Sequence, residues 1–136
     1  MKMILLDTDV ISHLLRYPAP SAVTAKLEAI PRHSRHMTTI SAGEILFGIQ
    51  RTGRHEELRT RFEDRFIPRV TVLPFDLEAA RAYSLVKAHL WKTGQPIDEA
   101  DMRIAATALS RDLTLITGNE SHFRRIPGLR IENWLR

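Results

Sequence analysis

Short runs of consecutive apolar residues alternate along the chain with stretches whose apolar residues recur every three or four positions. The first run, residues 3–6, is apolar at every position, which predicts a strand buried on both faces. It leads into residues 10–16, whose apolar residues have helical spacing, and Thr8 or Asp9 would cap this helix. Asp7 should therefore lie where a strand ends and a helix begins.

The same strand-then-helix pattern continues to the end of the chain. We expect further strands at 36–40, 70–73, 113–116 and 130–132, and helices at 21–30, 41–52, 54–66, 77–93 and 102–109, with a short helical turn at 122–123. Alternating strands and helices predict an α/β fold with a parallel sheet and right-handed crossovers. The length of 136 residues predicts one domain, residues 1–136, with one core.

Asp76 is expected to cap the helix at 77–93, and Gly94 to end it. The helix at 102–109 is rich in alanine and is expected to pack directly on the sheet. We expect Trp91 and Trp134 to lie in the core or at an interface, and three phenylalanines to lie in the core, with a partner-binding groove as the alternative. The phenylalanines concerned are Phe47, Phe62 and Phe66.

Composition excludes several classes of protein. The chain is 43% hydrophobic and 26% charged, as in ordinary globular proteins, and contains no cysteine, which excludes disulfide scaffolds and thiolate metal sites. No apolar run has the length of a membrane span, and the N-terminus does not have the pattern of a secretory signal. The cytoplasm is therefore the expected compartment.

The positive charge of the chain comes mainly from arginine. The net charge is +4, with 16 arginines and 4 lysines. Arginine is suited to phosphate and carboxylate, so a nucleic acid or an acidic protein is a plausible partner. A high genomic GC content would also explain the excess of arginine over lysine.

Acidic residues follow several predicted strands or begin the helices after them. Asp7, Glu44, and either Asp98 or Asp101 occupy such positions, and Asn119 follows the last long strand. Parallel strands end at the same edge of a sheet, so these side chains can converge there. Capping is the alternative for each acid separately: Glu44 has capping-box spacing from Ser41, and the other two fit a helix N-terminus.

Convergent carboxylates repel one another, and a bound cation would relieve that repulsion. The candidate ligands are hard oxygen atoms, and no histidine pair has ligand spacing, so the residues favour Mg²⁺ or Mn²⁺ over structural zinc. A divalent ion in such a site can activate water toward a phosphodiester. The residues therefore suggest metal-dependent phosphodiester hydrolysis.

Five segments of the chain resemble, in order, the motifs of PIN-domain ribonucleases, in particular the VapC-type toxins and their FitB-like branch. They are LLDTDVISHLLR, TTISAGEILFGI, VLPFD, GQPIDEADMRIAATAL and LITGNESHFRRIPGLRIENW. The resemblance covers essentially the whole chain. It implies a PIN-like three-layer α/β/α sandwich with a small central parallel sheet.

The resemblance also implies roles for individual residues. Asp7, Glu44 and Asp101 match the family's metal-binding acids, with Glu44 orienting or deprotonating the attacking water. Asn119 stands where the family often has aspartate, which removes one carboxylate, and Thr117 matches a hydroxyl of the site. These two would hold water or a phosphate oxygen. Asp98 does not occupy the family position and is left as a capping or outer residue.

The implied activity is Mg²⁺- or Mn²⁺-dependent endonucleolytic cleavage of RNA, such as tRNA or ribosomal RNA, which inhibits translation. The implied partners are a second copy of the chain and a cognate antitoxin, through which the complex would bind operator DNA. No membrane association is implied.

Two alternatives remain open at this stage. The protein could be a non-catalytic partner in a DNA-bound toxin–antitoxin repressor complex. Asp7-Thr8-Asp9 also resembles the Asp-x-Asp motif of haloacid-dehalogenase-like phosphatases, but the only lysines in the second half of the chain, Lys87 and Lys92, both fall in a predicted helix.

Overall fold

A five-stranded parallel sheet forms the centre of the molecule in the computed structural model, which describes residues 2–18 and 21–136. The strand order is β3-β2-β1-β4-β5, and every neighbouring pair is parallel. The strands are β1 (Ile4–Leu6), β2 (Arg35–Thr38), β3 (Thr71–Leu73), β4 (Thr114–Ile116) and β5 (Ile131–Glu132). The predicted parallel α/β sheet is therefore confirmed. Residues 1, 19 and 20 lie outside the described part of the chain.

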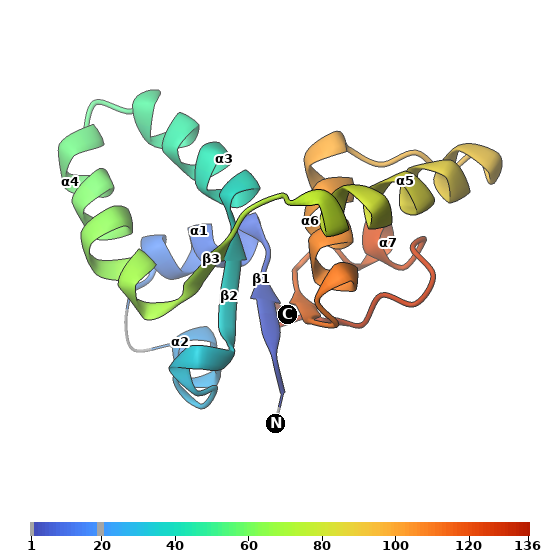
Figure 1. The fold of residues 1–136 in the computed structure, drawn as a ribbon. Helices are drawn as coiled ribbons and strands as arrows, with labels where there is room; N and C mark the ends of the chain where they lie inside the picture. The colour runs from blue at the N-terminus through green and yellow to red at the C-terminus, as the bar shows by residue number, and fades with distance from the viewer. Residues whose placement is uncertain (1, 19–20) are drawn as a thin grey trace.

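Helices cover both faces of this sheet (Figure 1). They are α1 (Thr8–Arg16), α2 (Ala22–Glu28), α3 (Thr39–Gln50), α4 (His55–Arg59), α5 (Leu77–Lys92), α6 (Glu99–Ser110) and α7 (Glu120–Phe123), with the 3₁₀ turns η1 (Arg32–Ser34) and η3 (Ile67–Arg69) and the π-helical segment η2 (Thr60–Phe66). Helices α1 to α4 lie on one side, and α5 to α7 lie on the other. This arrangement is the expected three-layer α/β/α sandwich.

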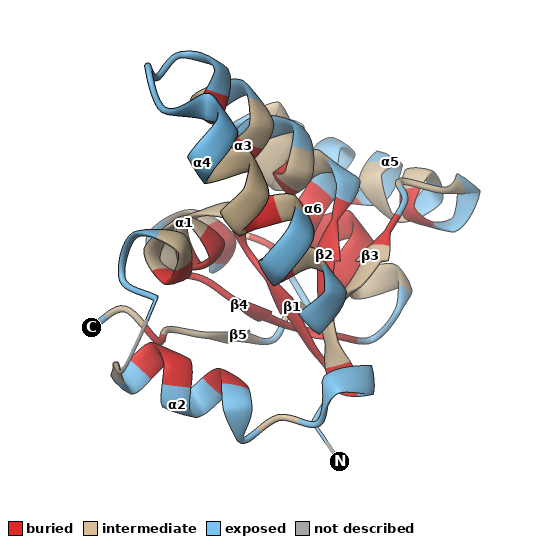
Figure 2. Ribbon diagram, turned by 90° about the vertical axis from the view of Figure 1, so that its left-hand side faces the viewer, coloured by how far each residue is buried: buried red, intermediate tan, exposed pale blue. Residues whose placement is uncertain are grey.

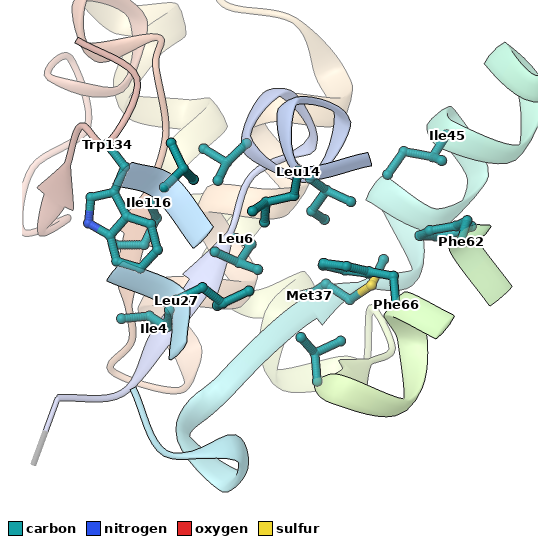
Figure 3. Close-up of a cluster of buried hydrophobic side chains, with 14 of the residues drawn as sticks. Ile4, Leu6, Leu14, Leu27, Met37, Ile45, Phe62, Phe66, Ile116 and Trp134 are labelled. Atoms are coloured by element: carbon teal, nitrogen blue, oxygen red, sulfur yellow. The ribbon is translucent and has the colours of Figure 1, made fainter. Parts of the chain in front are cut away.

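The central strand β1 shows why both faces must be covered. Ile4 and Leu6 pack in a core cluster with α1, α2, α3 and η2, whereas Leu5 packs in a second cluster with α5, α6 and α7. All three side chains are fully buried. Successive side chains of a strand point to opposite faces, so an uninterrupted apolar run requires a layer of helices on each side. Figure 2 shows the buried strands β1 and β4 between helices with exposed outer faces, and Figure 3 shows the first cluster.

Two helix starts differ from the predictions. Asp7 itself caps α1, since its carboxylate accepts a hydrogen bond from the Thr8 N–H, so the prediction of Thr8 or Asp9 as the cap was wrong. Strand β2 ends at Thr38, whose hydroxyl accepts from the Ser41 N–H and begins α3 two residues earlier than expected. The predicted capping box of Ser41 and Glu44 is therefore wrong, and the Glu44 carboxylate is available for other contacts.

The predicted helix at 54–66 is divided. A short α-helix, α4, passes into a π-helical segment, η2, and then a 3₁₀ turn, η3. Phe62 and Phe66 on η2 are buried and their rings stack 6.2 Å apart, as expected of core residues. Phe47 on α3 is 64% exposed, so its assignment to the core was wrong.

The second half of the chain follows the predictions more closely. Asp76 caps α5 by accepting a hydrogen bond from the Ala79 N–H, and Gly94 follows the helix with a positive φ of 65°. Helix α6 packs against α5 and contributes Ala105 and Ala108 to the second core cluster. Asp98 occupies the N-cap position of α6, as expected, but its side chain makes no capping hydrogen bond in the described structure.

Candidate active site

Asp7 lies at the carboxyl end of β1 and is held by two donors. One carboxylate oxygen accepts a hydrogen bond from the Thr8 N–H at 2.8 Å, and the other accepts from the Thr117 hydroxyl at 2.8 Å. Thr117 follows the neighbouring strand β4 and is completely buried. The parallel pairing of β1 with β4 thus brings together two side chains that are 110 positions apart in the sequence.

Glu44 approaches the same strand end from α3. Its carboxylate accepts a hydrogen bond from the Thr8 hydroxyl at 2.7 Å, and that hydroxyl also pairs with the Ser41 hydroxyl at 2.8 Å. Thr8 is adjacent to Asp7, so Glu44 is directed toward the site and not back toward its own helix start. The functional interpretation of Glu44 therefore agrees with the geometry better than the capping interpretation.

Asp101 in the first turn of α6 completes the set of predicted acids. Its pKa is raised to about 6, because the side chain is partly buried and because the charges of Asp98, Glu44 and Asp9 lie nearby; His122 acts in the opposite direction. The pKa of Asp7 is raised to about 7 by burial, by the charge of Asp9 and, less strongly, by that of Asp101. The charges of Asp7, Asp9, Glu44 and Asp101 therefore lie near enough to influence one another.

Asp9 belongs to this group, although the sequence analysis considered it only as a helix cap or as part of a phosphatase motif. One of its oxygens accepts a hydrogen bond from the Gly118 N–H at 2.9 Å. The other oxygen is buried and has no hydrogen-bond partner among residues 2–18 and 21–136. Burial raises the pKa of Asp9. The signal that could have identified it is its position two residues after Asp7, at the same strand end.

Asn119 lies beside Thr117, since its backbone N–H donates to the Thr117 hydroxyl at 3.0 Å. Its side-chain amide donates to Nδ1 of His122 at 2.9 Å and is thus directed to α7. His122 is half-buried and close enough to Asp101 to influence its pKa. The sequence analysis missed His122, because a single histidine in a short helical turn carries no distinctive spacing.

The donor atoms of this site fit a hard divalent cation that retains much of its water. In the described part of the chain, no group of three or more His, Asp or Glu side chains is arranged so that it could hold a metal ion by itself. Mg²⁺ is commonly held by one or two carboxylates together with water and substrate phosphate, so an enclosing protein cage is not required. The unpartnered oxygen of Asp9 and the raised pKa values of Asp7 and Asp101 are the features that a cation would relieve.

A groove of about 470 Å³ begins beside Glu44 and runs between α1, α3 and α4. Its apolar wall is formed by Leu15, Ile45, Ile49 and Leu58. Three arginines also line it, namely Arg16, Arg54 and Arg61. The groove therefore combines an apolar surface with positive charge directly next to the acids.

No helix in the described residues is long and apolar enough to span a membrane.

Comparisons of the sequence and of the structure with known proteins agree on one family. The PIN domain model matches residues 4–129. The VapC ribonuclease Y4jK of Sinorhizobium fredii is 35% identical over 136 residues, which cover 96% of each chain. The tRNA(fMet)-specific endonuclease VapC of Salmonella typhimurium is 36% identical over 98 residues, covering 72% of this chain and 74% of the relative.

Toxin FitB of Neisseria gonorrhoeae is 32% identical over 126 residues, which cover 89% of this chain and 91% of the toxin. Among solved structures, DNA-bound VapBC from Salmonella typhimurium superimposes with a TM-score of 0.92 at 30% identity, covering 98% of this chain and 99% of the other. The match to the PIN domain model, over residues 4–129, includes Asp7, Glu44 and Asp101. The chain belongs to the PIN-domain family, within its group of VapC and FitB toxins.

Proposed function

We propose that this protein is the toxin of a toxin–antitoxin pair and that it hydrolyses RNA phosphodiester bonds with the help of Mg²⁺ or Mn²⁺. The observation that carries the proposal is the gathering of Asp7, Glu44 and Asp101 at one sheet edge, with the pKa of Asp7 raised to about 7 and that of Asp101 to about 6. We also propose that residues 1–136 form a single PIN domain and that the reaction takes place in the cytoplasm.

Each residue of the site has a distinct task in this proposal. Asp7 and Asp101 would hold the divalent ion, and Thr117 fixes the Asp7 carboxylate by donating a hydrogen bond to it. Glu44, oriented by the Thr8 hydroxyl, would accept the proton of the attacking water. Asn119 would hold a water molecule or a phosphate oxygen. When bound, the ion would lower the pKa of water and neutralise charge on the phosphate.

The substrate and partners follow from the relatives and from the surface. One relative is named a tRNA(fMet)-specific endonuclease, so we propose tRNA or ribosomal RNA as the substrate. The arginine-lined apolar groove beside Glu44 suits an acidic, amphipathic segment of an antitoxin, which would thereby cover the site. One solved neighbour is a VapBC complex bound to DNA, and we propose that operator DNA is bound here only through the antitoxin.

We further propose that the protein forms a homodimer through α5. Leu77, Leu85 and Trp91 are 64%, 74% and 80% exposed, and all three lie on this helix. Large apolar side chains gathered on one exposed helix indicate an interaction surface. Burying them against a second copy of α5 would remove this surface from water.

The test is incubation of antitoxin-free protein with total RNA in the presence of Mg²⁺, Mn²⁺ or EDTA. We expect discrete cleavage products that require the metal and disappear in Asp7→Asn and Asp101→Asn variants. Asp64→Asn is the matched control, because Asp64 is an exposed acid on η2, away from the site. Folding of each variant is checked by circular dichroism.

Full cleavage by folded Asp7→Asn or Asp101→Asn protein would refute the assignment of the site. Absence of cleavage by folded wild-type protein with every metal would favour the alternative, a non-catalytic partner in a DNA-bound repressor complex.

A further inference from the structure

Phe47 lies on α3 one turn beyond Glu44 and is open to solvent. The helix begins at the end of β2 and extends away from the sheet (Figure 1). Residues three positions apart share one side of a helix, so Phe47 lies on the same side of α3 as Glu44, which is directed to the site by the Thr8 hydroxyl. The side chain of Phe47 is 64% exposed. An exposed aromatic ring therefore lies beside the proposed active site.

Arg51, one further turn along α3, places its guanidinium over the Phe47 ring, with Cζ 5.3 Å from the ring centroid. Among residues 2–18 and 21–136, this guanidinium forms no ion pair with an acidic side chain. By contrast, Arg54 and Arg61 both pair with Glu57. A guanidinium without an acidic partner keeps its N–H donors for another anion, and phosphate fits its geometry well.

The turn of α3 before Phe47 has no side chain at position 43. Gly43 precedes Phe47 by four positions, and a Cβ atom there would meet nothing within 4 Å. Side chains on a helix extend toward its N-terminus, which for Phe47 is the direction of Gly43. The open space at Gly43 and the exposure of Phe47 together leave room for a flat group beside the ring.

The groove proposed for the antitoxin lies on a different side of α3. That groove is lined by Ile45, Gly48 and Ile49 of this helix, and neither Phe47 nor Arg51 belongs to its lining. A ring beside a guanidinium matches a nucleotide, because any base can stack on an aromatic side chain and arginine binds the phosphate backbone. The charge and shape of this pair therefore favour a nucleic-acid strand over a protein segment.

We propose that Phe47 stacks on an unpaired base of the RNA substrate and that Arg51 binds a phosphate of the same strand, beside Glu44. The two residues hold the strand, whereas cleavage of the bond remains with the acids. This inference rests on the proposed function, because RNA is the proposed substrate.

The experiment measures binding of antitoxin-free protein to a short fluorescent single-stranded RNA of mixed sequence by anisotropy. It is done in EDTA and at low salt, where metal-dependent hydrolysis cannot occur. The second probe is an abasic ribose-phosphate oligomer of the same length. We expect Phe47→Ala to bind the RNA about tenfold more weakly, which is the scale of one lost stacking contact, and to bind the abasic oligomer as the wild type does.

Two further variants serve as controls for Phe47→Ala. Phe47→Trp should keep the affinity for RNA, because it restores a flat aromatic surface. Tyr17→Ala should also bind as the wild type does, because Tyr17 is another exposed aromatic residue but follows the end of α1 that is remote from Asp7.

The role of Arg51 is measured by the salt dependence of binding. Each phosphate contact to a single strand contributes about 0.7 to the slope of the logarithm of affinity against the logarithm of salt concentration. We expect Arg51→Gln to bind both probes more weakly and to lower this slope by about 0.7. An unchanged slope would overturn the phosphate contact of Arg51.

Unchanged affinity of folded Phe47→Ala for the RNA would overturn the inference and leave Phe47 as a contact for a protein partner. An equal loss of affinity for the RNA and for the abasic oligomer would overturn the stacking role, because the abasic oligomer has no base. Wild-type protein that binds neither probe would overturn the inference as well.

Cleavage of total RNA by the wild type in Mg²⁺ or Mn²⁺ reports separately on the proposed function. Protein that binds RNA through Phe47 without cleaving it would support the inference while refuting the ribonuclease. Wild-type protein that cleaves RNA, with a Phe47→Ala variant of equal RNA affinity, would support the ribonuclease and overturn the inference.

Discussion

Asp7 experiences opposing influences on its charge. Hydrogen bonds from Thr117 and Thr8 favour the ionised carboxylate, whereas burial and the nearby charges of Asp9 and Asp101 disfavour it. The unfavourable influences prevail, because the pKa is raised from 3.8 to about 7. In the absence of a cation, the folded protein therefore binds a proton at Asp7 more tightly than the unfolded chain does.

This difference in proton affinity predicts how the stability of the metal-free protein depends on pH. The contribution of Asp7 to the free energy of unfolding is fully present below pH 3.8 and is lost as the pH rises through about 7. We expect the melting temperature in EDTA to fall between about pH 4 and pH 7, and to fall less in Asp7→Asn. Scanning calorimetry over this range measures the effect, with Asp64→Asn as control. A slope in Asp7→Asn equal to that of the wild type would contradict it.

Gly118 is a second residue whose surroundings permit a prediction. A Cβ atom there would meet Leu135 at 2.7 Å and Asp9 at 2.9 Å, whereas a Cβ at Gly48 in α3 would meet nothing within 4 Å. Gly118→Ala should lower the free energy of unfolding by about 1–3 kcal/mol through overpacking. Gly48→Ala should raise it by about 0.5–1 kcal/mol, because glycine disfavours a helix interior.

Urea denaturation distinguishes these two variants. If Gly118→Ala were as stable as the wild type, the close approach of the loop to Asp9 would not be required for folding.

At the scale of secondary-structure elements, the junction between β2 and α3 depends on one hydroxyl. Thr38 is almost fully buried, and its side chain accepts from the Ser41 N–H at 3.0 Å. Thr38→Val keeps the shape of the side chain but removes the cap, so we expect a loss of about 1 kcal/mol in the free energy of unfolding. Urea titration measures this loss, and Glu44 would be displaced together with the helix start.

Ser41→Ala is the informative comparison, since Ser41 was the cap that the sequence predicted. Among the described contacts, the only hydrogen-bond partner of the Ser41 hydroxyl is the hydroxyl of Thr8. A larger loss of stability in Ser41→Ala than in Thr38→Val would contradict the capping role of Thr38.

The elements that the sequence predicted well are those with a strong local signal. The apolar run at 3–6 became the central strand β1, and Asp76 and Gly94 delimit α5 as expected. The sequence predicted the start of α3 too late in the chain. Thr39 and Ile40 are residues that favour strands, and Ser41 and Glu44 have the spacing of a capping box. Which of several adjacent hydroxyls caps a helix is decided by tertiary packing.

The π-helical segment η2 and the exposure of Phe47 also depend on tertiary packing, so the sequence did not predict them. Phe62 and Phe66 have ordinary helical spacing, and a local change to i→i+5 backbone hydrogen bonds has no sequence signature. Phe47 has apolar neighbours in sequence, yet it points away from the core. In the site, parallel topology predicted Asp7 and Glu44, and the choice of Asp101 over Asp98 came from the resemblance to the family. Asp9 and His122 required the fold itself, since their contacts are with Gly118 and Asn119.

At the scale of the whole molecule, α5 presents apolar side chains on its outer surface. Leu85 and Trp91 are among the most exposed large apolar residues described. We expect the wild type to sediment as a dimer at micromolar concentration and Leu85→Glu to shift the equilibrium toward monomer by about tenfold or more, because a charge would be buried at the interface. Lys26→Glu on α2 is the control, and analytical ultracentrifugation is the measurement. A monomeric wild type would contradict the proposed dimer.

The hydrogen bond between Thr117 and Asp7 also bears on how the protein is made. Asp7 is synthesised early, but its partner follows 110 residues later, and the strand that carries Thr117 is the neighbour of β1 in the sheet. A nascent chain therefore cannot complete the site until the segment through Thr117 has emerged from the ribosome. A ribonuclease assembled in this order would be inactive during most of its own translation, which protects the RNAs that are producing it.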